Sequence, residues 1–375
     1  MAVTNVARGA RRAWQDDGDV DMQSRALEYH WFRQGVYPNR ALEATAPRSL
    51  PYSVYLPYAM PMFAAYFEPG GRIQGRVILE LLSVACLAVI GFYGHRELRF
   101  AGPAMAAIGS VAGAAITGNI GTLAAGQFSI ICVALIILQI LLLERGNSAA
   151  AGVCWSLAMI KPQIALAFAL LFVIEKQWRG LLIGLAILAA LSLVACAWTD
   201  ISPLAMANHW LFKASLSFAE TAGTPGPGEL ARSIGANSRT VQMAALMLFG
   251  GLMAGLWWAS ARMCGGIPVL PIAGACGVAG ELLFYHQTYD HIMLAPTLFA
   301  LFALAARSRS MPAIAMAAIT AISVWLPMRF LSMLPYNYTG RAVIWSAAAA
   351  MLVSWAFREA TARSATSAAP GAGTA

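Results

Sequence analysis

Long apolar segments almost free of ionisable residues are the feature that most limits how this chain can fold. Hydrophobic residues make up 59% of the 375-residue sequence and charged residues only 11%, whereas a soluble domain has about 25% charged residues. An apolar helix of about 20 residues is long enough to cross a bilayer. The sequence therefore predicts an all-α, polytopic membrane protein.

The predicted spans lie between residue 77 and residue 357. They are expected near residues 77–94, 101–118, 127–143, 180–198, 241–260, 267–284, 292–306, 312–327 and 342–357. Residues 149–174 are harder to interpret, because Lys161 and Pro162 interrupt an apolar stretch. This stretch forms either one kinked span or two half-length helices that meet at a turn, so we expect about 9–11 membrane segments in a helical bundle.

The basic loops favour two half-length helices. Arg and Lys prefer the cytoplasmic side of a membrane. The basic segments are His95–Arg99, Glu144–Arg145, Glu175–Arg179, Arg262, Arg307–Arg309 and Arg358–Arg363. All of them share one side only if the chain turns back at Lys161. We therefore expect a multi-pass protein of the plasma (inner) membrane, with its C-terminus in the cytoplasm and the Lys161 turn facing outward.

Charge and cysteine content argue against two other classes. The net charge is +8, but the basic residues are scattered through short loops and form no dense tract, so nucleic-acid binding is not expected. The six cysteines lie in or beside apolar spans, with no CxxC pair and no Cys/His cluster at metal-ligand spacing. We interpret them as packing residues.

Residues 1–76 form the predicted outer region, which is rich in acids, arginines and aromatics. The segment Asp16–Asn39 indicates an acidic turn, a short amphipathic helix and a Gly-Val-Tyr-Pro stop. A carboxylate held at the start of a helix, Asp19 or Asp21, suits a general base that takes a proton from a sugar hydroxyl. The alternative is that both residues only cap the helix.

Two further segments flank the predicted spans. Residues 52–67 are aromatic and interrupted by prolines, which favours a juxtamembrane helix pair at the outer interface. Residues 358–375 are predicted to be a cytoplasmic, disordered tail, because the end of the chain is small, polar and Pro/Gly-bearing.

Lys161 is the sharpest signal within the apolar region. An ionisable side chain at membrane depth costs at least about 2.5–3.5 kcal/mol and needs an anionic partner or water. One interpretation is that Lys161 contacts a lipid phosphate. The other is that it lies near the outer interface and extends its ammonium group to the headgroups without a further role.

A second polar cluster lies in the sequence FYHQTYDHIML. It contains His286, Tyr289, Asp290 and His291. These side chains could bind a substrate through its hydroxyls or phosphate, anchor the chain at the interface, or ligate a metal. The spacing alone is a weak metal signal, and we expect none. Other ionisable residues near outer ends could neutralise one another or line a cavity; these are Glu80, Glu281, Arg329 and Arg341.

Three stretches resemble glycosyltransferase family 87, the polyprenyl-phosphate-sugar-dependent enzymes of the GT-C superfamily, over about residues 19–300. The most specific runs from GNIGTLAAGQ to MIKPQ and EKQWRG, where Gly126, Gln127, Lys161 and Pro162 carry the match. In the second, an acid precedes a Gly-x-Tyr turn by about fourteen positions, which favours Asp21 over Asp19. The third, TYDHIMLAP, is shorter and degenerate.

The resemblance implies an inverting transfer of a sugar, mannose or another hexose, from a polyprenyl-phosphate donor to a glycan or glycolipid acceptor, without a cofactor. Asp21 would remove the acceptor's proton while the polyprenyl phosphate departs. Lys161, His291 and Gln127 would bind the donor phosphate. The expected substrate contacts are His286, Tyr289, Asp290 and Tyr37.

The N-terminus of this sequence differs from that of the family. Family members begin with a cytoplasmic end and a first span that delivers the acidic loop outward, whereas MAVTNVARGARRAW has no apolar stretch. The expectation is that this first span is missing, through a misassigned start or a truncation. Two alternative functions remain open at this point: a transporter or flippase of envelope lipids, and a non-catalytic membrane scaffold.

Overall fold

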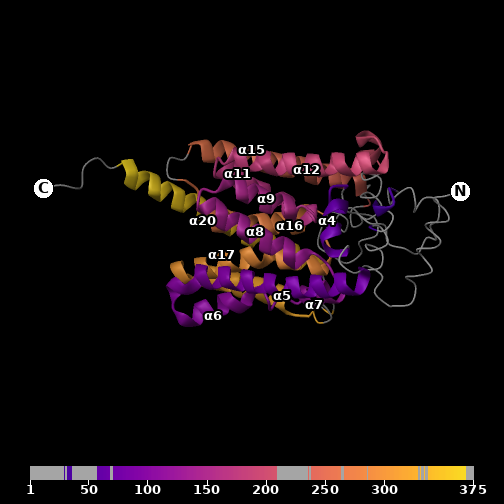
Figure 1. The fold of residues 1–375 in the computed structure, drawn as a ribbon. Coiled ribbons are helices and arrows are strands. Elements are labelled where there is room, and N and C mark those ends of the chain that lie inside the picture. The colour runs from indigo at the N-terminus through magenta and orange to yellow at the C-terminus, as the bar shows by residue number, and fades with distance from the viewer. Residues whose placement is uncertain are drawn as a thin grey trace.

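The structure is a computed structural model, and it describes residues 29, 32–35, 57–67, 71–208, 235, 238–262, 266–284, 286–327, 330, 333 and 337–368. Within these ranges every regular element is a helix (Figure 1). The first half contains α4 (Ala59–Phe67), α5 (Gly71–Leu98), η1 (Arg99–Ala101), α6 (Pro103–Ala112), α7 (Gly118–Ala124), α8 (Ser129–Glu144) and α9 (Ser148–Ala158). Then follow α10 (Pro162–Ala165), η2 (Leu166–Phe168), α11 (Ala169–Ile174), α12 (Trp178–Thr199), α15 (Ser238–Arg262), α16 (Val269–Leu283), η3 (Thr288–Leu294), α17 (Ala295–Ser308), α18 (Met311–Trp325) and α20 (Asn337–Ala368).

The helices form an elongated bundle of the kind that spans a membrane (Figure 1). Among the described residues, five segments are long and apolar enough to cross a bilayer; these are Gln74–Ala101, Trp178–Thr199, Met243–Arg262, Thr288–Ser308 and Tyr338–Ser364. The bent pair of α7 and α8 would make six, and shorter apolar helices occupy other predicted positions. The prediction of an all-helical polytopic membrane protein is confirmed, with fewer full-length spans than the 9–11 segments expected.

The segment around Lys161 consists of two short helical arms, as the basic loops predicted. α9 ends at Ala158, and the second arm begins at Pro162, which occupies the first turn of α10. Lys161 lies between them with an extended backbone (φ −119°, ψ 86°). A residue that precedes proline is held away from helical conformation, so Pro162 explains why the first helix stops here. The chain therefore reverses direction at Lys161, between two arms that are each shorter than a full membrane span.

The basic segments gather at the end of the bundle opposite this turn. Arg96 and Glu144 form an ion pair of 2.5 Å between the ends of α5 and α8. Arg307 and Glu359 form another of 3.2 Å between α17 and α20. These contacts join segments far apart in sequence, which supports the prediction that they lie on one side.

The C-terminal flanking segment differs from expectation. The last helix, α20, continues to Ala368, so the predicted disordered tail at 358–375 is helical in its first part. Glu359 explains the extension, because it accepts a hydrogen bond from Trp355 Nε1 (3.0 Å) and pairs with Arg307 and Arg363. In the predicted juxtamembrane segment, α4 buries Phe63 completely, so this helix packs into the bundle.

Candidate functional site

A buried ion pair joins the Lys161 turn to the polar segment that precedes α17. Lys161 Nζ lies 2.7 Å from Asp290 Oδ1, and the two side chains are only 3% and 1% exposed. Ser129 Oγ donates to the same carboxylate oxygen at 2.5 Å and accepts from Lys161 Nζ at 2.9 Å. The ammonium group also lies 4.6 Å from the centre of the Tyr289 ring. Lys161 therefore has the anionic partner that an ionisable group at membrane depth requires.

Local sequence holds η3 where Lys161 can reach it. Asp290 Oδ2 accepts from the backbone N–H of Gln287 at 3.1 Å, and a capping box at Gln287 begins η3. On the facing helix, Thr122 Oγ1 donates to the carbonyl of Tyr289 at 2.7 Å. Gly118 allows this approach, because a Cβ there would collide with the carbonyl oxygen of Thr288. The short helix α7 and η3 thus form one packed unit.

The Gly-Gln motif forms the turn between α7 and α8. Gly126 has a positive φ of 55°, which glycine adopts without strain, and the two helices meet at 116°. Gln127 follows with its side chain buried and its N–H bonded to the carbonyl of Thr122 at 2.8 Å. Phe128 stacks on Phe63 of α4, with ring centroids 5.6 Å apart. This bend places Ser129 at the start of α8, where it contacts the ion pair.

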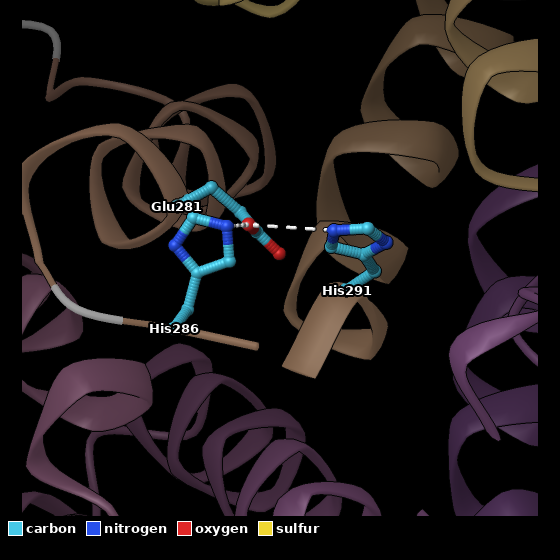
Figure 2. Close-up of side chains that lie close together, drawn as sticks. All are labelled: Glu281, His286 and His291. Carbon is cyan, nitrogen blue, oxygen red and sulfur yellow. Dashed lines mark ion pairs between the residues drawn. The ribbon is translucent and has the colours of Figure 1, made fainter. Parts of the chain in front are cut away.

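A second charged group lies next to η3 (Figure 2). Glu281, at the end of α16, places Oε2 2.6 Å from His286 Nε2 and 3.9 Å from His291 Nε2. All three side chains are at most 2% exposed. Burial by itself lowers the pKa of His286, but the adjacent Glu281 carboxylate outweighs it, so the pKa of His286 lies above its ordinary value. Among the described residues, Glu281 Oε1 has no hydrogen-bond partner.

Arg341 brings a positive charge to this group from the last helix. Its Nη2 atom lies 3.1 Å from both ring nitrogens of His291, and its guanidinium lies 4.5 Å from the centre of the Trp345 ring. Trp345 is itself held by a hydrogen bond from its Nε1 to Ser323 Oγ at 3.0 Å. Glu281, His286, His291 and Arg341 therefore form a buried network of both signs where the end of α16, η3 and the start of α20 meet.

Glu281, His286 and His291 are also the residues that could hold a metal, since one ligand atom from each lies within 4.8 Å of the others. Carboxylate and imidazole are ordinary ligands for zinc and similar ions. The guanidinium of Arg341 is 3.1 Å from the histidine nitrogen that would be a ligand. A fixed positive charge at that distance opposes a divalent cation, so the geometry fits a charge-balanced network better than a metal centre.

The structure brings together several residues that the sequence singled out. Lys161, Tyr289 and Asp290 are in contact, and His286 and His291 lie beside them on the same segment, with ring centroids 5.9 Å apart. Glu80 does not join them, because it pairs with Arg76 on the exposed face of α5 at 2.8 Å.

Asp19, Asp21, Tyr37 and Arg329 lie outside the residues that the structure describes. The segment that follows Asp21 is described in part: Tyr29 and Phe32 are buried, and the carbonyl of Phe32 accepts from Trp198 Nε1 at 2.6 Å. Gly35 then adopts a positive φ of 73°, as expected for the end of a short helix. The described residues 32–35 therefore lie against α12.

Sequence reasoning missed Ser129 as part of the site and gave Glu281 and Arg341 no partners. Ser129 carries no signal, because one serine at the start of an apolar helix is an ordinary capping residue. Glu281 and Arg341 stand out in the sequence as ionisable residues near the ends of apolar helices, but nothing there pairs them. Their sequence separation hides the fact that both reach His291.

The fold and this group of residues define a polytopic helical membrane protein with a buried, charged cluster at one end of the bundle. The profile of Glycosyltransferase family 87 matches residues 60–284. This match covers more than half of the 375 residues, and the chain belongs to that family. It is accordingly a membrane glycosyltransferase, an enzyme that acts on a sugar donor and an acceptor. No curated protein and no solved structure gives a significant match.

Proposed function

We propose that this protein transfers a hexose, such as mannose, from a polyprenyl phosphate to a glycan or glycolipid acceptor on the outer face of the plasma membrane. Membership of family 87 supports the class of reaction. The observation that carries the proposal furthest is the convergence of Lys161, Asp290 and His291 from distant segments at one end of an apolar bundle. A donor whose lipid lies in the bilayer presents its phosphate at such an end.

The proposed reaction is a single displacement with inversion. Asp21 removes the proton from an acceptor hydroxyl, whose oxygen then forms a bond to the anomeric carbon. The bond from that carbon to the donor phosphate oxygen breaks, and the polyprenyl phosphate leaves with both bonding electrons. A general base of this kind contributes about 10²–10⁴-fold to the rate, while Asp19 at the same turn serves as the alternative base.

The departing phosphate gains negative charge, so a catalyst places positive charge beside it. We propose that Lys161, His291 and Gln127 face the donor phosphate. Because Lys161 is already paired with Asp290 at 2.7 Å, the phosphate would share its ammonium group with that carboxylate. Arg341, 3.1 Å from His291, supplies a second positive charge next to the same residue. His286, Tyr289, Asp290 and Tyr37 are the proposed substrate contacts.

The proposed orientation follows from the positive-inside preference. The end that carries Arg96, Arg307 and Glu359 faces the cytoplasm, and the cluster around Asp290 faces outward. Ionisable residues in the described part of the bundle lie toward its two ends, whereas a transport pathway requires them on several helices at mid-depth. This distribution favours a transferase over a transporter.

The test is radiolabelled sugar transfer from a polyprenyl-phosphate donor in membranes that contain the native protein, Asp21→Asn or Asp19→Asn. We expect Asp21→Asn to lower the rate by at least about 10²-fold and Asp19→Asn, the same change at the neighbouring acid earlier in the chain, to retain most of it. Equal transfer by native protein and Asp21→Asn would remove Asp21 as the base. Transfer that stops with Asp19→Asn alone would assign the base to Asp19.

A further inference from the structure

A groove opens at the end of the bundle that is remote from the polar cluster. It has a volume of about 810 Å³ and lies between the α5–α6 connection, the end of α17 and the start of α18. Its walls are mainly apolar, with Phe100, Ile108, Phe302 and Ile314 among them, and Arg307 and Arg309 line it as well. This volume is in the range of roughly 300–1,000 Å³ that is common for sites that bind small molecules.

The groove lies at headgroup depth if the long helices span the bilayer. Two membrane-length segments end at it, Gln74–Ala101 and Thr288–Ser308. Its arginines follow directly on the second of these, and α17, with 14 residues, separates them from η3 by roughly 20 Å at a rise of 1.5 Å per residue. The apolar walls continue along α6 and α18, through Met105, Ile108, Ile314 and Ala317.

The charge at the groove is positive. Glu359 is the carboxylate that Arg307 contacts, at 3.2 Å, and Arg363 contacts the same carboxylate at 3.5 Å. One acid is therefore shared by two arginines, while Arg309 is exposed beside them. The guanidinium of Arg307 also lies 5.0 Å from the centre of the Phe100 ring, which holds it over the apolar wall.

The end of α17 alone accounts for part of this charge, because basic residues are favourable at a helix C-terminus. The helix end does not account for the apolar groove that lies next to these arginines. Arg309 is also in the left-handed region (φ 51°), a position that usually carries Gly or Asn at a helix end. An arginine there accepts backbone strain and presents its side chain at the mouth of the groove.

We propose that this groove binds one anionic phospholipid of the surrounding membrane. The anionic phosphodiester of the headgroup lies at Arg307 and Arg309, and one acyl chain lies along Ile108 and Ile314. Basic pockets between membrane helices on the cytoplasmic side recognise anionic headgroups in this way. The site is separate from the proposed transfer chemistry and would exist whether or not Asp21 is the base.

The test is native mass spectrometry of the purified full-length protein in detergent, titrated with phosphatidylglycerol or with phosphatidylcholine of the same acyl chains. We expect one phosphatidylglycerol to bind at least about 5-fold more tightly, a difference of about 1 kcal/mol in binding free energy. Arg309→Gln should remove most of this preference. Ala318→Trp, which fills the groove wall, should weaken both lipids.

Arg262→Gln is the matched control, since Arg262 also ends a membrane-length helix but stacks on Trp258 at 3.5 Å and does not line the groove. It should leave the preference unchanged. Equal binding of the two lipids, or an unchanged preference in Arg309→Gln, would overturn the proposal. So would displacement of phosphatidylglycerol by inorganic phosphate alone, which would indicate an anion site, or by a polyprenyl phosphate at lower concentration, which would assign the groove to the donor lipid.

Discussion

The two ends of the bundle hold their charged side chains in opposite ways. At the η3 end, Lys161 and Asp290 are 3% and 1% exposed and share a hydrogen bond with Ser129. At the other end, Arg96 and Glu144 are 35% and 26% exposed, although their contact is as short as 2.5 Å. Contact length is therefore a poor guide to the role of an ion pair.

Burial makes the difference. A buried pair holds its partners in one arrangement, because either charge left alone would be strongly unfavourable. An exposed pair exchanges its contacts with water at little cost. The buried pair thus restrains the side chains of the η3 end, which is what the proposed substrate-positioning role requires. The exposed pairs of the basic end impose no such constraint.

The largest effect should come from breaking the buried pair on one side only. Lys161→Met leaves the Asp290 carboxylate buried without its cation, which should cost about 3–5 kcal/mol in the free energy of unfolding. The double variant Lys161→Met with Asp290→Leu should recover most of that loss, because no charge remains. Thermal unfolding in detergent measures both. A double variant as unstable as the single one would contradict this account of the pair.

The ion pair between His286 and Glu281 should make stability depend on pH. The pKa of His286 is raised by the Glu281 carboxylate, against the opposing effect of burial. The stabilisation that this ion pair gives the folded protein is therefore fully present below the ordinary histidine pKa of about 6.5. It is lost as the pH rises through the raised pKa of His286. Hydrogen bonds to charged groups contribute about 1.5–3 kcal/mol, which sets the expected size.

The measurement is the melting temperature of the native protein and of His286→Gln from about pH 6 to about pH 9, a range that begins near the ordinary histidine pKa of about 6.5. The difference in melting temperature between the native protein and His286→Gln should become smaller as the pH rises. If it stays constant or grows, His286 is not charged in the folded protein.

Two helix glycines, Gly277 and Gly255, differ in how closely their helices are packed. Gly277 faces η3 so closely that a Cβ would collide with the carbonyl oxygen of Met293, whereas a Cβ on Gly255 of α15 would meet nothing within 4 Å. Gly277→Val should cost about 1–3 kcal/mol through overpacking and lower sugar transfer by displacing η3. Gly255→Val should leave both quantities nearly unchanged. If Gly255→Val loses as much stability and transfer as Gly277→Val, close packing against η3 does not cause the losses.

The smallest effect should come from the exposed pair at the basic end. Arg96→Gln should cost at most about 1 kcal/mol, and less as salt is added, because exposed ion pairs are weak and screened. Unfolding in low and high salt checks this. A loss comparable to that of Lys161→Met would mean that Arg96 has a structural role that its exposure does not indicate.

Much of this arrangement could be predicted from the sequence, because it depends on local composition. The apolar helices, the turn at Lys161 and Pro162, and the gathering of basic loops follow from hydropathy, from proline geometry and from the sidedness of charge. That Lys161 and Asp290 need polar partners could also be anticipated, since ionisable residues are costly beside apolar spans, whereas the roles of Lys161, Asp290 and His291 in binding stay predictions. Asp19 and Asp21, with the role of general base, stay predictions.

The pairings could not be predicted. Lys161 and Asp290 are separated by 129 positions, and Arg341 lies 50 positions beyond His291. No periodicity relates such residues, and several acids could have neutralised Lys161. The α7–α8 bend and the close approach of α7 to η3 decide which one does.

By itself, the sequence determined that this chain is a helical membrane protein with a polar end, because solvent preference acts on each segment separately. The tertiary structure alone decided which charges are neutralised, that Lys161 is paired with Asp290 and Ser129, and that Arg341 joins His291 and Glu281. The physical reason is that a buried charge is stabilised by the groups that packing brings within a few ångströms.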